Sequence, residues 1–169
     1  MYQRILLAYD GSLEGRRALR EGALLAKRCG AQVYLLSIIP DTPGMRVAEA
    51  TFAGAVSRQA DHHHAIFEEG VARLRRIGME PVARQVQDEP ARAITSFASE
   101  VNADLVVVGH RRRSLAERWW SGPDGAYLAD HVGCSLLVAR RDIDDATFEA
   151  EITAPEAARK RPDEGPRQA

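Results

Sequence analysis

Two short segments of the sequence place polar side chains and glycine directly after an apolar run. In the first, Asp10 follows residues 5–9 and precedes Gly11 and Ser12. As a site residue, Asp10 would accept a hydrogen bond from a base or a sugar. As a turn residue, it would bond to the backbone that follows it and help to cap the next helix. The residue type favours the turn role, whereas the position at the end of a strand favours the ligand-binding role. Taken together, the two roles are evenly matched.

The second segment is strongly basic. Gly109 ends the apolar run 105–108 and is followed by His110 and by arginines at 111–113, and Gly122 opens the next helical stretch. A glycine after a strand, together with the backbone donors of a helix N-terminus, commonly forms a phosphate site. The alternative is a solvated basic loop, which the residue types alone favour.

Histidine and cysteine side chains do not form a recognisable catalytic or metal-binding group in the sequence. His62, His63 and His64 are consecutive on a predicted helix, so their side chains point apart and no metal site is expected. Cys29 and Cys134 are expected to be buried thiols in a reducing cytoplasm. No set of Cys, His and acidic residues predicts nucleophilic catalysis, so the sequence favours a binding role over an enzyme.

The composition is typical of a globular domain. Of the 169 residues, 45% are hydrophobic and 28% are charged, and the formal net charge is -1. A net charge near zero provides no extended basic surface, so nucleic acid is not an expected partner. No apolar run approaches the roughly 20 residues needed to cross a membrane, and the N-terminus lacks the pattern of a signal peptide. We therefore expect a soluble cytoplasmic protein that does not bind membranes.

Apolar runs and helical stretches alternate along most of the chain. Continuous apolar runs are typical of strands buried on both faces, and the helical stretches carry apolar residues at three- and four-residue steps. Ser12 is expected to cap the first helix and Gly30 to end it. The expected strands are 5–9, 33–39, 81–86, 105–108 and 135–139, and the expected helices are 13–29, 56–77, 90–101 and 122–132.

Five strands separated by four helices predict an α/β fold, with a five-stranded parallel sheet and helices on both faces. In such sheets ligands bind beyond the carboxyl ends of the strands, where the strand order reverses. The strand ends of interest here fall near residues 10, 40, 88 and 109. Function is therefore expected at that edge.

The charge pattern separates a folded domain, residues 1–140, from a C-terminal extension, residues 141–169. The extension holds eight acidic and five basic residues, so its net charge is -3, and it contains few large apolar side chains. Such a segment buries too little surface to offset the entropy of ordering. We expect it to be largely disordered after about residue 153. Within residues 142–153, a short helix or an extended arm would dock through Ile143, Phe148 and Ile152.

Three motifs, in this order and spacing, resemble the universal stress protein family over residues 3–140. They are residues 5–12 (ILLAYDGS), 103–109 (ADLVVVG) and 127–138 (YLADHVGCSLLV). The resemblance implies a Rossmann-like sheet with strand order 3-2-1-4-5 and a homodimer formed by pairing of the last strands. It also implies a role in stress survival or signalling rather than a defined catalytic reaction.

Family members that bind ATP carry a glycine, two residues, a second glycine, nine residues, and a third glycine followed by Ser or Thr. Gly109 and Gly122 fit the first and third positions with the spacing intact. Arg112 stands at the second glycine and Pro123 at the hydroxyl residue.

The resemblance also implies an adenine end of the site. Asp10 and Ile38 would line it, and Ala8 and Tyr9 would supply backbone there. This arrangement requires the connection after the fourth strand to overhang the same crevice as Asp10.

Three residues of the phosphate segment depart from the motif in ways that weaken phosphate binding. Arg112 does not supply the positive φ or the close backbone approach of glycine at low cost. Pro123 removes a hydroxyl and a backbone N–H, and Asp124 adds a carboxylate to the first turn of the helix. Losing two donors, at roughly 1–3 kcal/mol each, would weaken ATP binding by tens-fold or more. Arginine side chains would offset part of this loss, because a guanidinium group can bind a phosphate through two N–H donors. The arginines that would reach a phosphate are Arg118 and those at 111–113.

We interpret the chain as a stress-response binding or signalling module with a modified adenine-nucleotide pocket, which holds ATP or AMP weakly and needs no metal. The alternative is an ATP-binding switch with slow hydrolysis, in which arginines replace the missing glycine and hydroxyl. Beyond a nucleotide, the expected partners are a second copy of the chain, through the last strand, and a regulatory protein.

Overall fold

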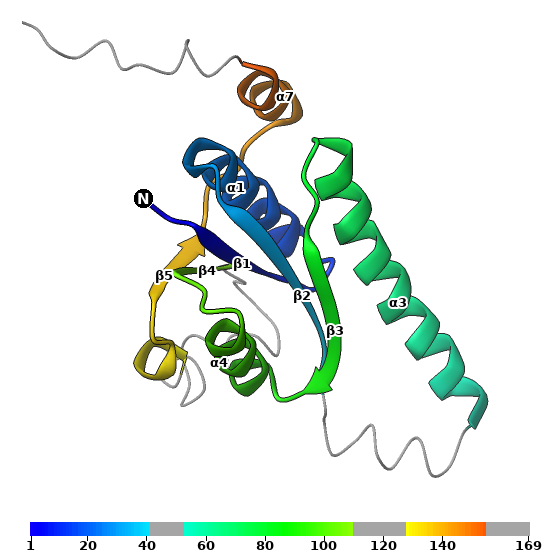
Figure 1. Cartoon of the computed structure of the whole chain (residues 1–169). Helices are drawn as coiled ribbons and strands as arrows, with labels where there is room; N and C mark the ends of the chain where they lie inside the picture. The colour runs from blue at the N-terminus through cyan, green and yellow to red at the C-terminus, as the bar shows by residue number, and fades with distance from the viewer. Residues whose placement is uncertain (41–52, 110–127, 155–169) are drawn as a thin grey trace, which may run out of the picture.

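A single parallel sheet organises the chain (Figure 1). The structure, a computed structural model, describes residues 1–40, 53–109 and 128–154. Its five strands lie in the order β3-β2-β1-β4-β5, which confirms the predicted fold class and strand order. The strands are β1 (Arg4–Tyr9), β2 (Gln32–Pro40), β3 (Val82–Asp88), β4 (Leu105–Gly109) and β5 (Ser135–Ala139).

Helices cover both faces of the sheet. Helices α1 (Leu13–Cys29) and α3 (Ala53–Arg76) lie on one face, and α4 (Pro90–Glu100) lies on the other (Figure 1). Residues 128–131 are also helical, and Leu128 is buried on the α4 face, but the predicted start of that helix lies outside the described residues. Within the described ranges, no helix combines the length and the apolar character needed to cross a membrane.

Strand β1 shows why the central strands are apolar throughout. Ile5, Leu7 and Tyr9 point into the core beneath α1 and α3, whereas Leu6 and Ala8 point into the core on the α4 face. β1 also has a neighbouring strand on each side. A strand covered in this way has no solvated face, so its sequence is a continuous apolar run rather than an alternating one.

The ends of α1 agree with the sequence prediction. Ser12 is the N-cap, and its hydroxyl accepts the backbone N–H of Gly15 at 2.9 Å. Gly30 ends the helix with a φ of 63°, a left-handed conformation that favours glycine. Helix α4 begins at Pro90 as expected, and its N-cap is Glu89, a residue that the sequence analysis did not name.

Most predicted bounds agree with the structure to within one residue, and two elements differ by more. Strand β3 continues to Asp88 instead of ending at residue 86, because it keeps its pairing with β2 as far as Pro40. Helix α3 begins at Ala53 instead of residue 56 and ends at Arg76 instead of residue 77. Both differences are at element ends, where the apolar pattern carries the least information.

The segment that follows the sheet folds back onto α1. Helix α7 (Asp145–Thr153) is capped by Asp144, and Ile143 and Ile152 are buried against Leu24 of α1. Of the two forms expected for residues 142–153, the structure has the helix. Residues 155–169 lie outside the described part of the chain, so the disordered tail stays a prediction.

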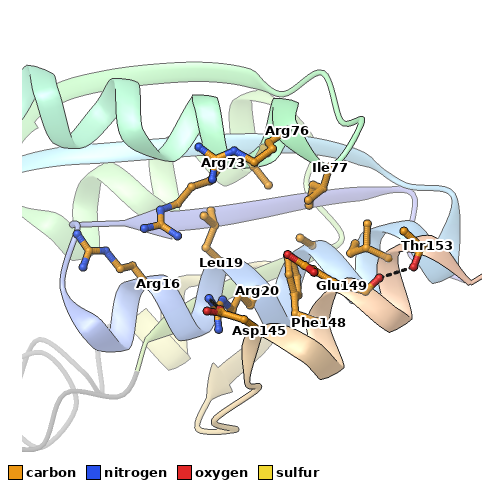
Figure 2. Close-up of a pocket in the computed structure, with 13 residues that line it drawn as sticks. Arg16, Leu19, Arg20, Arg73, Arg76, Ile77, Asp145, Phe148, Glu149 and Thr153 are labelled. Atoms are coloured by element: carbon orange, nitrogen blue, oxygen red, sulfur yellow. Dashed lines mark hydrogen bonds and ion pairs between the residues drawn. The ribbon is translucent and has the colours of Figure 1, made fainter.

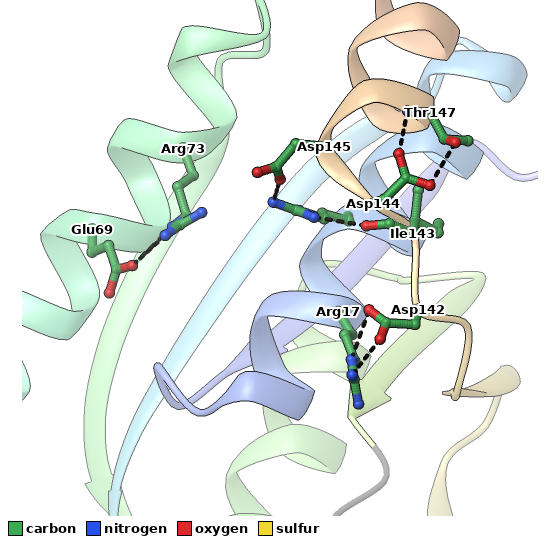
Figure 3. Close-up of polar contacts among 9 residues, drawn as sticks. Arg17, Glu69, Arg73, Asp142, Ile143, Asp144, Asp145 and Thr147 are labelled. Carbon is green, nitrogen blue, oxygen red and sulfur yellow. Dashed lines mark hydrogen bonds and ion pairs between the residues drawn. The ribbon is translucent and has the colours of Figure 1, made fainter.

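Ion pairs follow the same line of contact (Figure 3). They join Arg17 to Asp142, Arg20 to Asp145 and Arg28 to Glu151. Arg20 also donates to the backbone carbonyl of Ile143 at 2.7 Å. The residue numbers of the paired side chains increase in the same order on α1 and on the segment 142–151. Helix α7 therefore runs alongside α1 and parallel to it.

Candidate functional site

The carboxyl ends of β1 and β4 lie side by side in the middle of the sheet. Leu7 of β1 is opposite Val107 of β4, so Tyr9 and Gly109, each two residues further on, end at the same edge. From β1 the sheet continues to β2 on one side and to β4 on the other. The strand order therefore reverses at this point, where parallel sheets usually open a crevice for a ligand.

Asp10 forms a tight turn directly after β1. Its Oδ1 atom accepts the backbone N–H of Ser12 at 3.0 Å and the hydroxyl of Ser12 at 2.5 Å. Gly11, between them, has a φ of 71°, which few other residues adopt at low cost. Asp10 thus has the turn role that the residue type favoured, and its side chain is exposed at the edge of the sheet, where a ligand would meet it.

Gly109 packs directly against the first turn of α1. A Cβ atom at position 109 would stand 2.7 Å from the carbonyl carbon of Glu14 and 3.0 Å from the backbone nitrogen of Gly15. A Cβ atom on Gly15 would in turn overlap the carboxylate of Asp10. Asp10, the first turn of α1 and the end of β4 are therefore in one continuous contact.

Gly15 is a site residue that the sequence analysis missed. The available signal was a glycine in the first turn of a helix, a place where it costs about 1 kcal/mol relative to alanine. Such a residue usually has a packing reason, and here the reason is the Asp10 carboxylate.

The residues expected at the adenine end divide between the two faces of the sheet. Ala8 is half-buried and Ile38 is buried, and both belong to the α4 face. The ring of Tyr9 lies on the opposite face, where it packs against Gly70 of α3. Of Tyr9, only the backbone is therefore available on the side of Ala8 and Ile38.

The N-terminus of α1, which follows Asp10, determines the electrostatics on its side of the candidate site. The N-terminus of α1 carries a partial positive charge from its backbone dipoles. Asp10 and Glu14 place two carboxylates at that terminus, and the Ser12 hydroxyl already occupies one N–H donor. This side of the crevice therefore suits hydroxyl and amino groups better than a phosphate.

Four of the residues predicted to form the site lie outside the described residues. They are Arg112, Gly122, Pro123 and Asp124. The structure brings Gly109, where their segment begins, next to the first turn of α1 and Asp10. How that segment lies relative to the crevice stays a prediction.

The histidine and cysteine residues show no reactive arrangement in the described part of the chain. No group of three or more His, Cys, Asp or Glu side chains that could hold a metal occurs there. His63 is half-buried, and burial, together with the neighbouring His62, lowers its pKa. Cys29 and Cys134 are free thiols, and both are half-buried rather than fully buried as expected. Partial burial still raises the pKa of Cys134, which makes it a poorer nucleophile.

Comparisons with known proteins agree with this architecture. The chain is similar to a putative universal stress protein of Staphylococcus haemolyticus, with 26% identity over 92% of this chain and 94% of the relative. It is 29% identical to a universal stress protein of Thermus aquaticus, over 83% of this chain and 100% of the relative.

Solved structures share the fold. A universal stress protein of Lactobacillus plantarum has a TM-score of 0.66 at 21% identity, covering 82% of this chain and 98% of its own. One from Archaeoglobus fulgidus in complex with dAMP has a TM-score of 0.59 at 21% identity, covering 82% and 98%. A family protein from Arabidopsis thaliana with AMP bound has a TM-score of 0.55 at 18% identity, covering 85% and 94%.

The match to a family as a whole covers the entire sheet. The model of the universal stress protein family matches residues 1–140, which include all five strands and the adjoining ends of β1 and β4. Helix α7 lies beyond the matched residues. On this evidence, the chain belongs to the universal stress protein family.

Proposed function

We propose that this protein is a cytoplasmic stress-response module that binds an adenine nucleotide in the crevice between β1 and β4 and acts by binding rather than by catalysis. Adenine and ribose would lie near Ala8, Asp10 and Ile38, and the phosphate end would face the segment that begins at Gly109. The observation that carries this proposal is the contact of Gly109 with the first turn of α1, next to Asp10. It supports the proposal because the two strand ends that would hold the ligand share one edge.

The comparisons support an adenine nucleotide as the ligand. Two of the similar solved structures are complexes with AMP and with dAMP. Both nucleotides carry one phosphate, which suits a site next to a helix N-terminus that already holds the acidic residues Asp10 and Glu14.

The sequence of the phosphate segment argues for weak binding of a long phosphate chain. Arg112 and Pro123 replace the glycine and the hydroxyl of the ATP-binding motif, and Asp124 adds a negative charge. We therefore expect AMP to bind at least as tightly as ATP. The alternative, an ATP switch with slow hydrolysis, rests on the arginines at 111–113, which would neutralise a triphosphate.

The last strand is the proposed interface for a second copy of the chain. Strand β5 is at the end of the strand order, so one of its edges has no partner strand among the described residues. Leu136, Leu137 and Val138 are only half-buried in the single chain. An apolar edge strand of this kind favours pairing with an identical strand. A monomer at micromolar concentration in light scattering would contradict the dimer.

Calorimetric titration tests the nucleotide site. AMP should bind, and guanosine monophosphate should bind more weakly. Asp10→Ala should weaken the binding of AMP. Glu80→Ala is the control and should leave AMP binding unchanged, because Glu80 is an exposed carboxylate at the opposite edge of the sheet. Because Asp10 also supports the α1 cap, Asp10→Asn serves as a second variant that keeps an acceptor at the turn. No affinity for any adenine nucleotide would overturn the proposal. Low-micromolar affinity for ATP with release of phosphate would favour the ATP switch.

A further inference from the structure

A concave site lies on the α1 and α3 face of the sheet, apart from the residues of the proposed nucleotide site. It is a groove of about 410 Å³ between α1, α3 and α7 (Figure 2), called here the interhelix groove. None of Ala8, Asp10, Ile38 or Gly109 lines it. One of its walls is α7, which lies beyond the residues matched by the family model. Its volume is in the range that holds a small organic molecule.

The floor of the interhelix groove is apolar. Its apolar lining residues come from all three helices and are Leu19, Ala23, Leu74, Ile77, Phe148 and Ile152. Four of these six are buried, and Ile77 and Phe148 are half-buried. The floor therefore accepts the hydrocarbon part of a ligand, since such a contact removes apolar surface from water.

Arginine side chains supply an excess of positive charge at the rim on the α3 side. Arg16 and Arg73 both bind the same Oε1 atom of Glu69, at 3.1 Å and 2.8 Å, so one carboxylate serves two guanidinium groups. Arg76 also lines the groove, and it has no hydrogen bond or ion pair with any described residue. Three guanidinium groups, those of Arg16, Arg73 and Arg76, thus face the single carboxylate of Glu69. The excess positive charge can bind an anion.

A buried hydroxyl lies near the Arg16 end of the groove. Tyr9 is only 2% exposed and does not itself line the groove, and its hydroxyl interacts with the guanidinium of Arg16. Burial raises the pKa of Tyr9, and the nearby Arg16 and Arg73 act in the opposite direction. Arg16 is therefore shared between Glu69 and Tyr9, and Arg76 is the lining arginine that is left to bind an anion.

The wall made by α7 carries the opposite charge. Arg20 is satisfied by Asp145 and by the carbonyl of Ile143, so it adds little net charge to the groove. Glu149 also lines the groove, and its carboxylate has no ion pair with a described residue. A ligand is therefore oriented, with its negative group toward α3 and away from Glu149.

We propose that the interhelix groove binds a small amphipathic anion, with its apolar body on the floor and a carboxylate or phosphate head at Arg73 and Arg76. The apolar floor excludes a purely ionic ligand, and the arginine rim disfavours a neutral one. The proposal does not depend on nucleotide binding between β1 and β4.

Titration of the full chain with decanoate and with decyl phosphate, below their micelle concentrations, tests the proposal by calorimetry and by NMR. At least one should bind and shift amide signals of Ala23 and Ile77. Acetate, which has no apolar body, and decanol, which has no charge, should bind at least tenfold more weakly. The relative affinities of the two anions identify the preferred head group. Failure of both anions to bind, or equal binding of decanol, would overturn the proposal.

Charge variants locate the binding. Arg76→Gln should weaken the bound anion about fivefold, the effect of one partly exposed charge pair. Arg75→Gln is the matched control, because Arg75 is on the same turn, pairs with Glu80 and does not line the groove. Glu149→Gln should strengthen binding by removing a repulsive charge. Equal effects of Arg76→Gln and Arg75→Gln would contradict the proposed site, and AMP affinity should not change in either variant.

Discussion

Gly109 of β4 lies against the backbone of Glu14 in α1, and a Cβ atom at position 109 would stand 2.7 Å from both the carbonyl carbon and the carbonyl oxygen of Glu14. A flexible side chain would give way to such an atom, but the backbone of a helix does not. The contact therefore fixes the distance between the end of β4 and the first turn of α1. A ligand between β1 and β4 meets two elements whose relative position is set before it binds.

Replacing this glycine should destabilise the fold. Gly109→Ala is expected to lower the free energy of unfolding by about 1–3 kcal/mol, the usual cost of forcing an extra carbon into a packed interior. Urea denaturation measures the change. Gly133→Ala is the control, because a Cβ atom at position 133 has no neighbour within 4 Å. Equal stability of the two variants would show that the close contact between Gly109 and the backbone of Glu14 does not exclude a Cβ atom at position 109.

Restoring the ATP-binding motif should strengthen ATP binding. The double variant Arg112→Gly, Pro123→Ser returns the second glycine and the hydroxyl, and we expect at least about a tenfold gain in ATP affinity from two recovered donors. Adenosine, which has no phosphate, should bind as before. Arg111→Gly is the control, since position 111 is not a motif glycine. An equal gain for adenosine and ATP would contradict the assignment of these positions to the phosphate end.

Glu69 should make stability depend on pH. Burial raises the pKa of this carboxyl, but hydrogen bonds from Arg16 and Arg73 outweigh burial, so the pKa in the folded chain is below its usual value of 4.5. A carboxylate of this kind stabilises the fold above its unfolded pKa, and the stabilisation is lost as the pH falls through the folded pKa. Glu69→Gln should therefore melt at a lower temperature than the unmodified chain at pH 7, and the difference should shrink as the pH falls below 4.5 and through the folded pKa.

The control for this measurement is Glu68→Gln, on the same helix at an exposed position. Its melting temperature should stay close to that of the unmodified chain at each pH. A difference between Glu69→Gln and the unmodified chain that stays constant down to pH 3 would assign the effect to packing rather than to the ion pairs.

Docking of α7 should protect the connection after β5 from proteolysis. Ile152 is buried against α1, so Ile152→Asp should release the helix and speed tryptic cleavage at Arg140 and Arg141 by several-fold. Ala150→Asp introduces the same charge on the exposed side of α7 and should not change the rate. Equal rates for Ile152→Asp and the unmodified chain would show that α7 is not held by this contact.

Much of the fold follows from local sequence signals. The apolar runs of β1 and β4 have no polar positions because both faces are covered, and Ser12 and Gly30 are cap residues whose chemistry acts within a few residues. The apolar pattern predicts too early an end for β3, which is an edge strand. Its pairing with β2, rather than its own apolar pattern, determines where it stops.

The candidate sites were predictable only in part. Asp10 and Gly109 stand out in the sequence because each follows an apolar strand, but the packing of Gly15 against Asp10 depends on how α1 leaves the turn. The interhelix groove had no sequence signal. Arg16 and Arg73 are 57 positions apart, and only the packing of α1 beside α3 brings them to the same atom of Glu69.

The contact between α7 and α1 affects how the protein matures during synthesis. Arg20 and the Ile143 carbonyl that it binds are 123 residues apart, so α1 leaves the ribosome long before its covering helix is made. In that interval Leu24 lacks the two isoleucines that bury it, and a chaperone has access to this apolar surface. The interhelix groove therefore gains its third wall only in one of the last steps of folding, and a prematurely terminated product would lack it.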